Sequence, residues 1–342
     1  MSVRKAVMVT GGAGYIGSHT AKALHHAGYR PVVFDDLSNG HAEAVKWGPL
    51  VVGDVRDRSA VGRCMAEHAI DAVIHFAGLI EVGRSMVEPD AFWDHNLNGV
   101  ASVLAAMRAT GVRRIVFSST AAVYGQPEPG SLQALHEDLP LVPINPYGDS
   151  KLAAERLIAA SARAYGLEGV ALRYFNAAGA DPGGELGEAH HPESHLIPLA
   201  IEAALGLGRP LTVFGQDFPT ADGACVRDYI HVADLAQAHV LALDADLGPT
   251  RFAAMNLGLG RGRSVMEVIA AVDSATGRRT PRTLGPRREG DPASLVADPS
   301  RARDRLNWRP QHTELEGIVA SAVRWRRRPA FGAFADMLEA AS

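Results

Sequence analysis

The sequence has 342 residues, of which 47% are hydrophobic and 21% are charged, and its formal net charge is −4. This balance is typical of a globular protein with a sizeable core, and the acidic sign argues against a nucleic-acid partner. Two cysteines, Cys64 and Cys225, exclude a disulfide framework, and no apolar run approaches the roughly 18 residues of a membrane span. We therefore expect a cytoplasmic protein with no secretory signal and no membrane partner.

Short apolar runs alternate with helical patterns through the first half of the chain. The runs are rich in β-branched residues and apolar on both faces, as the strands of a parallel sheet between helices are. They occupy residues 5–10, 31–35, 49–53, 71–78, 113–119 and 169–175. Helical patterns at 18–28 and 96–110 each end at or just before a glycine. The alternation predicts an α/β fold with a doubly wound parallel sheet of the Rossmann type.

The composition changes near residue 178, where a stretch rich in Gly, Pro, His and acidic residues predicts a long irregular connection to residue 195. Beyond it we expect a second, smaller α/β lobe, with domains at 1–177 and 178–342 and some later segments returning to the first. Ser264 and Glu267 have the spacing of a capping box, which opens a helix. An arginine cluster within 323–342 is expected on a solvated terminal helix. The other predicted elements are helices at 196–208 and 232–244, strands at 211–215 and 252–258, and a loop at 216–228.

A glycine-rich stretch, TGGAGYIGSH at 10–19, directly follows the first predicted strand. Gly11, Gly14 and Gly17 allow a tight turn, close approach of the backbone to a pyrophosphate, and close packing of the next helix on the strand. That helix directs its free N–H groups and the positive end of its dipole at the phosphates. The position of the motif between a strand and a helix predicts a dinucleotide site.

The second predicted strand ends at Asp35, 18 residues after Gly17. A carboxylate there can accept hydrogen bonds from the adenosine ribose and would repel a 2′-phosphate, so we expect NAD rather than NADP. The ends of the third and fourth strands should contribute further cofactor contacts. These are Asp54 and Val55, which would face the adenine, and Phe76, Ala77 and Gly78 of the HFAG sequence.

Tyr147 and Lys151 lie four residues apart and therefore face the same side of a helix. On its own, such a pair could be an exposed helix start after Pro146. Here it follows a strand that ends in FSSTAAVYG at 117–125, which places small hydroxyl groups at the sheet edge where ligands bind. The surroundings therefore favour a catalytic pair.

The order TGGAGYIG, HFAG, FSSTAAVYG and PYGDSK resembles the extended short-chain dehydrogenase/reductase family. The resemblance implies that Tyr147 is the acid/base, that Lys151 holds the cofactor ribose and lowers the tyrosine pKa, and that Thr120 positions the reacting hydroxyl. A free tyrosine has a pKa of about 10, so a base near neutrality needs a shift of ~3 units, or ~4 kcal/mol. One unit charge ~4 Å away at an effective dielectric of ~20 supplies ~4 kcal/mol. Lys151 together with an oxidised nicotinamide could therefore supply the shift.

Nearly the whole chain is similar to the UDP-glucose 4-epimerases of that family, most specifically at 213–236. Other matching stretches are 34–40, 172–182, 195–200 and 287–292. The similarity implies an isomerase of galactose metabolism that inverts C4 of a UDP-hexose by transient hydride transfer to tightly bound NAD. It also implies a homodimer formed through helices near 92–110 and 148–165.

The same similarity assigns the remaining contacts. Arginine suits the diphosphate because its forked donors match phosphate oxygens, and an aromatic ring can flank uracil. The additional cofactor contacts are Tyr15, Ile16, Asn39, His95, Asn96 and Phe175. The UDP-sugar contacts are Thr120, Asn176, His195, Leu196, Thr212, Val213, Phe214, Arg227, Arg288, Asp291 and Leu295.

Three positions depart from the pattern of these relatives. Ile80 stands where a lysine is common, so we expect one cofactor contact to be missing. His95 precedes Asn96 where an asparagine pair is common. Leu295 stands where a bulky aromatic accompanies unacetylated sugars and a small residue accompanies N-acetyl tolerance, so acceptance of UDP-N-acetylglucosamine stays open.

Several alternatives remain. The substrate could be UDP-N-acetylglucosamine, UDP-xylose or UDP-glucuronate. A nucleotide-sugar 4,6-dehydratase would need an acid and a base directly after Thr120, where Ala121 and Ala122 cannot transfer protons. A non-catalytic NAD-sensing regulator on this fold would not need Tyr147 and Lys151. The HHPESH sequence at 190–195 has the spacing of neither a helix face nor a zinc finger, so no metal is expected.

Overall fold

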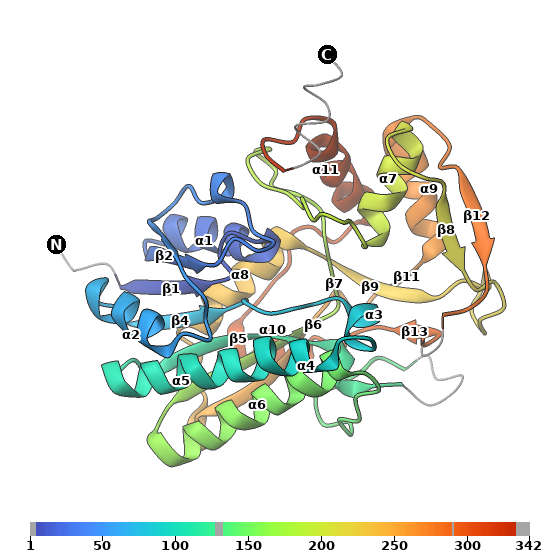
Figure 1. Cartoon of the computed structure of the whole chain (residues 1–342). Coiled ribbons are helices and arrows are strands. Elements are labelled where there is room, and N and C mark those ends of the chain that lie inside the picture. Colours follow the sequence, from blue (N-terminus) through green and yellow to red (C-terminus); the bar gives the residue numbers. More distant parts are fainter. Residues whose placement is uncertain (1–4, 127–132, 289–290, 333–342) are drawn as a thin grey trace.

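A seven-stranded parallel sheet forms the centre of the molecule, as the alternating pattern predicts (Figure 1). The computed structural model describes residues 5–126, 133–288 and 291–332. The strand order is β10-β6-β5-β4-β1-β2-β3, so the winding direction reverses beside β1, where such sheets bind ligands. The strands are β1 (Ala6–Thr10), β2 (Arg30–Asp35), β3 (Leu50–Val52), β4 (Ala72–His75), β5 (Arg114–Thr120), β6 (Glu168–Tyr174) and β10 (Phe252–Leu257).

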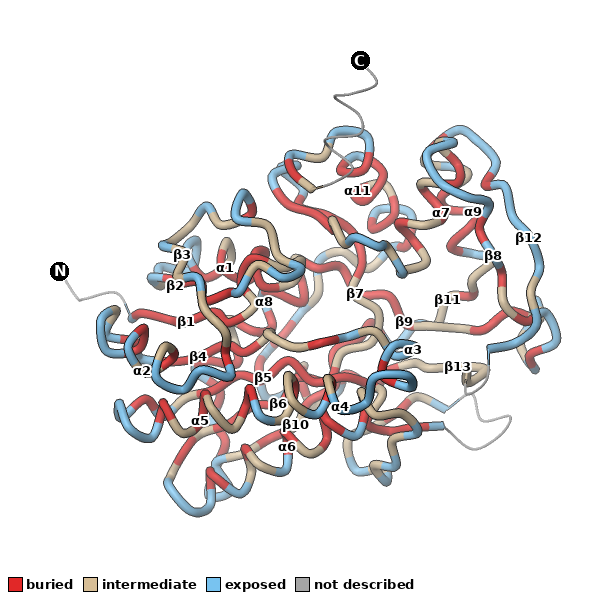
Figure 2. The backbone as a smooth tube through the Cα atoms, in the orientation of Figure 1, coloured by how far each residue is buried: buried red, intermediate tan, exposed pale blue. Residues whose placement is uncertain are grey.

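Helices cover both faces of this sheet, which confirms the doubly wound arrangement. One face packs against α2 (Arg58–Glu67), α5 (Gly99–Thr110) and α6 (Pro146–Tyr165). The other packs against α1 (Tyr15–His26), α8 (Val232–Ala242) and α10 (Ser300–Leu306). Apart from the edge strand β3, the strands between them are mostly buried (Figure 2), because a parallel sheet with helices on both sides has little surface exposed to water.

The second, smaller lobe has its own apolar core. Its helices are α7 (Leu196–Leu205), α9 (Val265–Thr276) and α11 (Leu315–Arg327), which lie together at the upper right of Figure 1. The capping box predicted at Ser264 is present, with the Ser264 hydroxyl accepting from the Glu267 amide at 3.1 Å. The strands are β8 (Leu211–Phe214) paired with β12 (Arg282–Gly285), and β9 (Val226–His231) paired with β7 (Asn176–Ala178), β11 (Gly262–Ser264) and β13 (Ser294–Leu295).

Two regions differ from the simplest expectation. The strand predicted at 252–258 is β10, which leaves the second lobe and pairs in parallel with β6 of the large sheet. The loop predicted at 216–228 gives way to strand β9 from Val226 onward. Both differences arise from pairing with strands far away in the sequence, which a local pattern does not encode.

The arginine-rich helix α11 is also less solvated than predicted. Arg326 is only 4% exposed and Trp325 only 3% exposed, because this side of the helix packs inside the second lobe. The last residues of the predicted helix, 333–342, lie outside the described residues. Within the ranges described, no helix combines the length and the apolar character needed to cross a bilayer. Short helical segments complete the chain: η1 (Ala42–Ala44), α3 (Val82–Ser85), α4 (Pro89–Phe92), the π-helical η2 (Trp93–Asn98), η3 (Ala121–Tyr124) and η4 (Gly248–Thr250).

Candidate active site

A cavity of about 480 Å³ is lined by residues at the carboxyl ends of the large sheet and by residues of the second lobe. This is the place where a parallel sheet of this topology binds ligands. Most of the predicted site residues meet in its wall. They are Gly11, Gly14, Tyr15, Ile16, Gly17, Asp35, Asn39, Asp54, Val55, Phe76, Ala77, Gly78, His95, Thr120, Tyr147, Phe175, Asn176, His195 and Leu196.

The glycine-rich loop leaves the N-terminus of α1 open toward the cavity. Gly14 is the N-cap of α1 and provides no side-chain cap, so the amides of the first turn remain available to a ligand. A Cβ on Gly17 would lie 2.2 Å from the Gly11 carbonyl oxygen, and a Cβ on Gly11 would lie 2.6 Å from the Ala77 nitrogen. Only glycine fits at these two positions, as the dinucleotide motif predicts.

Asp35 is fixed at the end of β2 by backbone amides. Its carboxylate accepts hydrogen bonds from Ala13 and Leu37, each at 2.9 Å. Burial raises the pKa of Asp35, while the hydrogen bonds from the two backbone amides partly oppose this rise. Since Asp35 also lines the cavity, it places an acceptor where an adenosine ribose would bind and disfavours a 2′-phosphate. The geometry therefore fits NAD.

The predicted catalytic groups come together where β5 ends and α6 begins. The Asn145 side chain caps α6 by accepting from the Gly148 amide at 2.8 Å, which fixes the first turn and with it Tyr147. The Thr120 side chain hydrogen-bonds to Tyr147. The neighbouring hydroxyls have other partners, since Ser118 contacts Tyr174 and Ser119 donates to Glu155. The structure thus places Thr120, rather than either serine, beside the tyrosine.

Lys151 lies one turn further along α6 and is only 2% exposed. Its Nζ donates to the Ser118 carbonyl at 3.1 Å and lies 5.0 Å from the centre of the Phe117 ring. Burial lowers the pKa of Lys151 to about 8. Burial also raises the pKa of Tyr147, and the hydrogen bond to Thr120 only partly offsets this rise. In the protein alone, burial therefore keeps the pKa of Tyr147 above its ordinary value, and the lowering expected from the lysine charge is not seen.

Lys151 and Asn96 lie directly behind the cavity wall. A Cβ on Gly78, which does line the cavity, would be 2.6 Å from Asn96 Oδ1 and 3.6 Å from Lys151 Nζ. Asn96 accepts from the Leu79 amide at 2.8 Å and donates to the Leu79 carbonyl at 3.1 Å. These two predicted cofactor contacts therefore lie within reach of a ligand that passes closely over Gly78.

The other predicted UDP-sugar contacts form a second group in the smaller lobe, outside the wall of this cavity. Arg288 Cζ lies 4.0 Å from the centre of the Phe214 ring, and Arg227 Nη2 lies 3.5 Å from Asp291 Oδ1. Leu295 pairs with Arg227 across β13 and β9. The complete second group is Thr212, Val213, Phe214, Arg227, Arg288, Asp291 and Leu295.

Two features connect this second group to the cavity. Leu295 packs in the same apolar cluster as Phe175, which lines the cavity. Strand β9, which contains Arg227, also contributes Tyr229 to the cavity wall. Two of the three positions that depart from the sequence pattern, Ile80 and His95, lie in this wall as well. Ile80 is 41% exposed there, and His95 Nδ1 contacts the Ala91 carbonyl at 2.9 Å.

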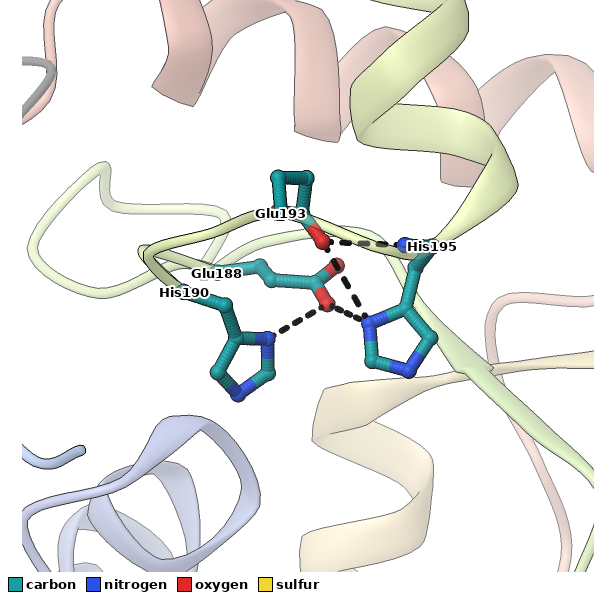
Figure 3. Close-up of side chains that lie close together, drawn as sticks. All are labelled: Glu188, His190, Glu193 and His195. Atoms are coloured by element: carbon teal, nitrogen blue, oxygen red, sulfur yellow. Dashed lines mark hydrogen bonds and ion pairs between the residues drawn. The ribbon is translucent and has the colours of Figure 1, made fainter. Parts of the chain in front are cut away.

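The irregular connection before α7 contributes residues that the sequence did not suggest. Glu188 and His190 line the cavity beside His195 (Figure 3). The Glu188 carboxylate oxygen Oε1 lies 2.6 Å from His195 Nδ1 and 3.0 Å from His190 Nδ1, and Glu193 Oε1 lies 3.5 Å from His195 Nδ1. We call Glu188, His190, Glu193 and His195 the Glu188 cluster. The only sequence signal was the richness of this stretch in His and Glu, because the loop has no regular spacing.

Comparison with known proteins agrees with this site. Residues 7–258 match the model of the NAD dependent epimerase/dehydratase family. A UDP-glucose 4-epimerase of Rhizobium leguminosarum bv. trifolii is 49% identical over 324 residues, which cover 95% of this chain and 98% of the relative. One from Streptomyces lividans is 46% identical over 320 residues, with coverages of 93% and 95%.

Solved structures show the same relationship. The crystal structure of UDP-glucose 4-epimerase from Brucella ovis in complex with NAD has a TM-score of 0.89 at 48% identity and covers 94% of this chain and 98% of its own. The UDP-Glc/GlcNAc 4-epimerase of Campylobacter jejuni has a TM-score of 0.81 at 38% identity, with the same coverages. These matches confirm the predicted family, fold and NAD dependence. The chain belongs to the NAD dependent epimerase/dehydratase family.

Proposed function

We propose that the chain is an isomerase that interconverts UDP-glucose and UDP-galactose by inverting C4 of the hexose, in galactose metabolism. The observation that carries this proposal is the position of Tyr147. It is hydrogen-bonded to Thr120 in the wall of the cavity that the glycine-rich loop and Asp35 also line. The UDP-glucose 4-epimerases named above, similar over nearly the whole chain, support it.

The reaction needs a group that moves a proton at the sugar 4-hydroxyl. Bound NAD supplies a reversible acceptor for the C4 hydride. Tyr147 takes the hydroxyl proton as the hydride leaves and gives it back when the hydride returns to the opposite face. Thr120 holds the reacting oxygen beside the phenol, and the positive charges of Lys151 and of the oxidised nicotinamide stabilise the phenolate against burial.

Inversion also requires that the nucleotide be held while the hexose turns. Arg227 and Arg288 are suited to grip the diphosphate, and Asp291 to bind the uridine ribose. These residues lie in the smaller lobe, whereas the glycine-rich loop lies in the larger. We therefore place NAD binding in residues 1–177 and UDP-sugar binding in residues 178–342, with β10 joining the first domain.

Other members of the family indicate alternative substrates and an alternative reaction. The Campylobacter jejuni relative is described as acting on N-acetylated sugar as well, and Leu295 leaves room for that breadth here. UDP-xylose and UDP-glucuronate are further candidate substrates. A 4,6-dehydratase is disfavoured because Ala121 and Ala122, next to Thr120, have no proton to transfer.

The test is incubation of the purified protein with UDP-galactose and no added cofactor, followed by product analysis. We expect UDP-glucose at equilibrium with the substrate. A 4-keto-6-deoxy product would indicate a dehydratase, and an unchanged substrate would indicate a regulator. The same assay on UDP-N-acetylglucosamine, UDP-xylose and UDP-glucuronate measures substrate breadth.

We also propose that the protein is a cytoplasmic homodimer. Helices α5 and α6 lie side by side on one face of the large sheet (Figure 1), and the sequence resemblance assigns the contact to these helices. Both cysteines are free and buried, as suits a reducing compartment. Sedimentation analysis should give twice the chain mass of 36.2 kDa, and charge reversal at exposed Arg156 and Arg163 of α6 should shift it toward the monomer.

A further inference from the structure

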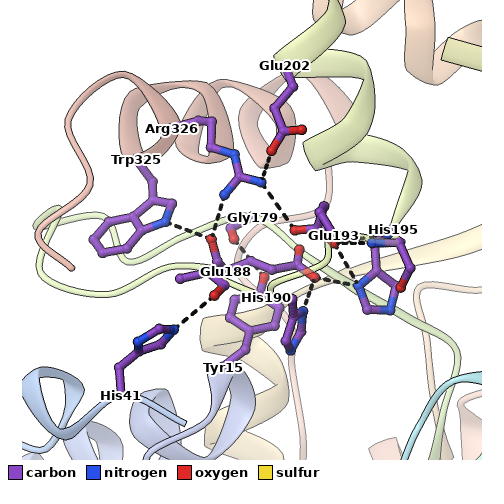
Figure 4. Close-up of polar contacts among 12 residues, drawn as sticks. Tyr15, His41, Gly179, Glu188, His190, Glu193, His195, Glu202, Trp325 and Arg326 are labelled. Atoms are coloured by element: carbon purple, nitrogen blue, oxygen red, sulfur yellow. Dashed lines mark hydrogen bonds and ion pairs between the residues drawn. The ribbon is translucent and has the colours of Figure 1, made fainter. Parts of the chain in front are cut away.

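The Glu188 cluster is held from behind by the smaller lobe and from the side by α1 (Figure 4). The Arg326 guanidinium donates to Glu193 at 3.2 Å and also pairs with Glu202 of α7. Trp325 Nε1 donates to the Glu188 carbonyl at 2.9 Å. On the other side, Tyr15 of α1 donates its hydroxyl to the Gly179 carbonyl at 2.6 Å, and its ring lies edge-on to the His190 ring with 6.4 Å between the ring centres. The cluster is therefore a rigid part of the cavity wall.

Within the cluster, the acidic and basic side chains differ in how far they are exposed to the cavity. The Glu188 side chain is only 8% exposed, whereas the His195 side chain is 44% exposed and lines the cavity. His195 Nδ1 faces the carboxylates of Glu188 and Glu193, so the ring presents its other edge away from them. A buried carboxylate without a partner would be strongly unfavourable, and a protonated His195 supplies that partner. The negative charge is thus buried and the positive charge is accessible.

His195 is also the N-cap of α7. A cation at this end of a helix is repelled by the helix dipole, whereas an anion is stabilised there. The adjacent residues Leu196 and Ile197 line the same cavity, so the first turn of α7 faces it as well. An imidazolium at this position weakens the helix but strengthens the binding of an anion, because two positive groups then converge on one point.

The geometry favours an ion pair over a bound metal. The four side chains offer ligand-type atoms within 4.8 Å of one another. However, Glu188 Oε1 and His195 Nδ1 are only 2.6 Å apart, which is the distance of a direct charge-assisted contact. Two tetrahedral ligands of zinc, each at about 2.0–2.1 Å from the ion, would lie roughly 3.3 Å apart. The two groups therefore form a direct ion pair with no room for a metal between them.

We propose that Glu188 and Glu193 hold His195 as an imidazolium that binds the diphosphate of the UDP-sugar. The inference rests on the proposed function, because it takes the diphosphate to be that of the substrate. His195 is already among the UDP-sugar contacts that the resemblance implies, so the new element is the role of the two glutamates, which are positioning residues. The attraction of Glu188 and Glu193 outweighs burial and raises the pKa of His195, so the charge persists above neutral pH.

The test measures the Kd of UDP-glucose by calorimetry at pH 8 and pH 6, in a Tyr147→Phe background that prevents turnover. His195→Gln should raise the Kd about tenfold at both pH values, the effect of losing a hydrogen bond to a charged group. Glu188→Gln should raise it severalfold at pH 8 and much less at pH 6, because His195 then titrates near its ordinary pKa of about 6.5. The Tyr147→Phe protein without a further substitution should bind UDP-glucose with the same Kd at pH 8 and pH 6, because the diphosphate diester does not titrate in this range.

The matched control is Glu202→Gln, which alters the carboxylate on the far side of Arg326 and should leave the Kd unchanged. The groups around His195 that could also titrate are Glu188, Glu193, His190 and Tyr15. Comparing Glu188→Gln with the His195→Gln, Glu188→Gln double variant isolates His195, because the pH dependence should vanish in the double variant.

Several results would overturn the inference. An unchanged Kd for His195→Gln would do so, as would loss of bound NAD with no loss of UDP-glucose affinity, which would assign His195 to the cofactor diphosphate. One zinc per chain by elemental analysis, with binding abolished by a chelator, would make the cluster a metal site. A wild-type protein that binds UDP-glucose without epimerising it would refute the proposed function alone.

Discussion

Two groups of ionisable side chains share the cavity, and they handle charge in opposite ways. Tyr147 and Lys151 are buried with hydroxyl and carbonyl partners, so burial moves both pKa values toward the uncharged forms. In the Glu188 cluster, opposite charges contact each other directly, and both Glu188 and His195 are shifted toward their charged forms. Burial thus disfavours the charged forms of Tyr147 and Lys151, whereas direct ion pairs stabilise the charged forms in the Glu188 cluster.

The difference suggests a division of labour. A reacting group has to gain and lose a proton within one turnover, so a site that disfavours its charge until substrate and nicotinamide arrive suits catalysis. A group that only holds a diphosphate should keep the same charge throughout. Four predictions test this division of labour, and they are given in order of decreasing expected effect.

The largest effect is expected for Tyr147→Phe. Removal of the hydroxyl should lower kcat by about 10³-fold or more, because general acid–base catalysis contributes about 10²–10⁴-fold and the neighbouring Tyr174 phenol is hydrogen-bonded to Ser118 rather than to Thr120. Bound NAD and the Kd of UDP-glucose should be nearly unchanged. A variant that retained a tenth of the wild-type kcat would remove Tyr147 from the chemistry.

Lys151→Met should lower kcat by about 10²-fold yet stabilise the NAD-free protein. Burial lowers the pKa of Lys151 to about 8, so its charge opposes folding below that pH, by at most about 3 kcal/mol at pH 7. The wild-type protein should gain stability as the pH rises from 8 to about 10.5, and the variant should not. Denaturant unfolding at pH 7 and pH 10.5 measures both. Equal stability of the two proteins at pH 7 would contradict this reading.

Glu188→Gln should instead destabilise the fold, most clearly in mild acid. Burial opposes the charge of Glu188, but His195 and His190 outweigh it and lower its pKa. The resulting stability is present above the ordinary glutamate pKa of about 4.3 and is lost as the pH falls through the lowered value. We expect Tm to fall by several degrees at pH 5.5, with the difference shrinking toward pH 3. Glu316→Gln, at an exposed position of α11, is the control and should leave Tm within about a degree.

The smallest effect is expected at Leu295, which belongs to neither group. Its replacement by alanine should open the sugar pocket and raise kcat/KM for UDP-N-acetylglucosamine relative to UDP-glucose by a factor of about 3–10, since one side chain in a pocket discriminates by about 1–3 kcal/mol at most. Tyr147, Lys151 and His195 should be unaffected, so kcat for UDP-glucose should stay within about twofold. If the ratio of the two kcat/KM values did not change, a residue other than Leu295 would determine the range of substrates.

The sequence predicted those features that local patterns encode. The glycine-rich loop, Asp35 at a strand end and the spacing of Tyr147 and Lys151 each depend on a few neighbouring residues and on the period of one element. The partnership of Thr120 with Tyr147 could be proposed because parallel strands deliver their carboxyl ends to one edge.

Other features depend on contacts between distant segments and could not be predicted in this way. The sequence of β10 predicts a strand, but its partner β6 lies about 80 residues earlier, and the residues near β10 do not indicate which strand it pairs with. Glu188 and His195 meet because an irregular loop is held by α1 and α11, so no spacing rule applies. Arg326 looked solvated because its partners Glu193 and Glu202 lie more than 120 residues away.

The return of the chain to the large sheet has a consequence for dissecting the molecule. A fragment ending at residue 177 would lack β10, α8 and α10, and so would leave β6 as an open edge and uncover one apolar face of the sheet. Such a truncation should aggregate rather than survive as an autonomous cofactor-binding unit. Because the polypeptide passes between the lobes several times, neither can be excised, swapped or transplanted by a single cut.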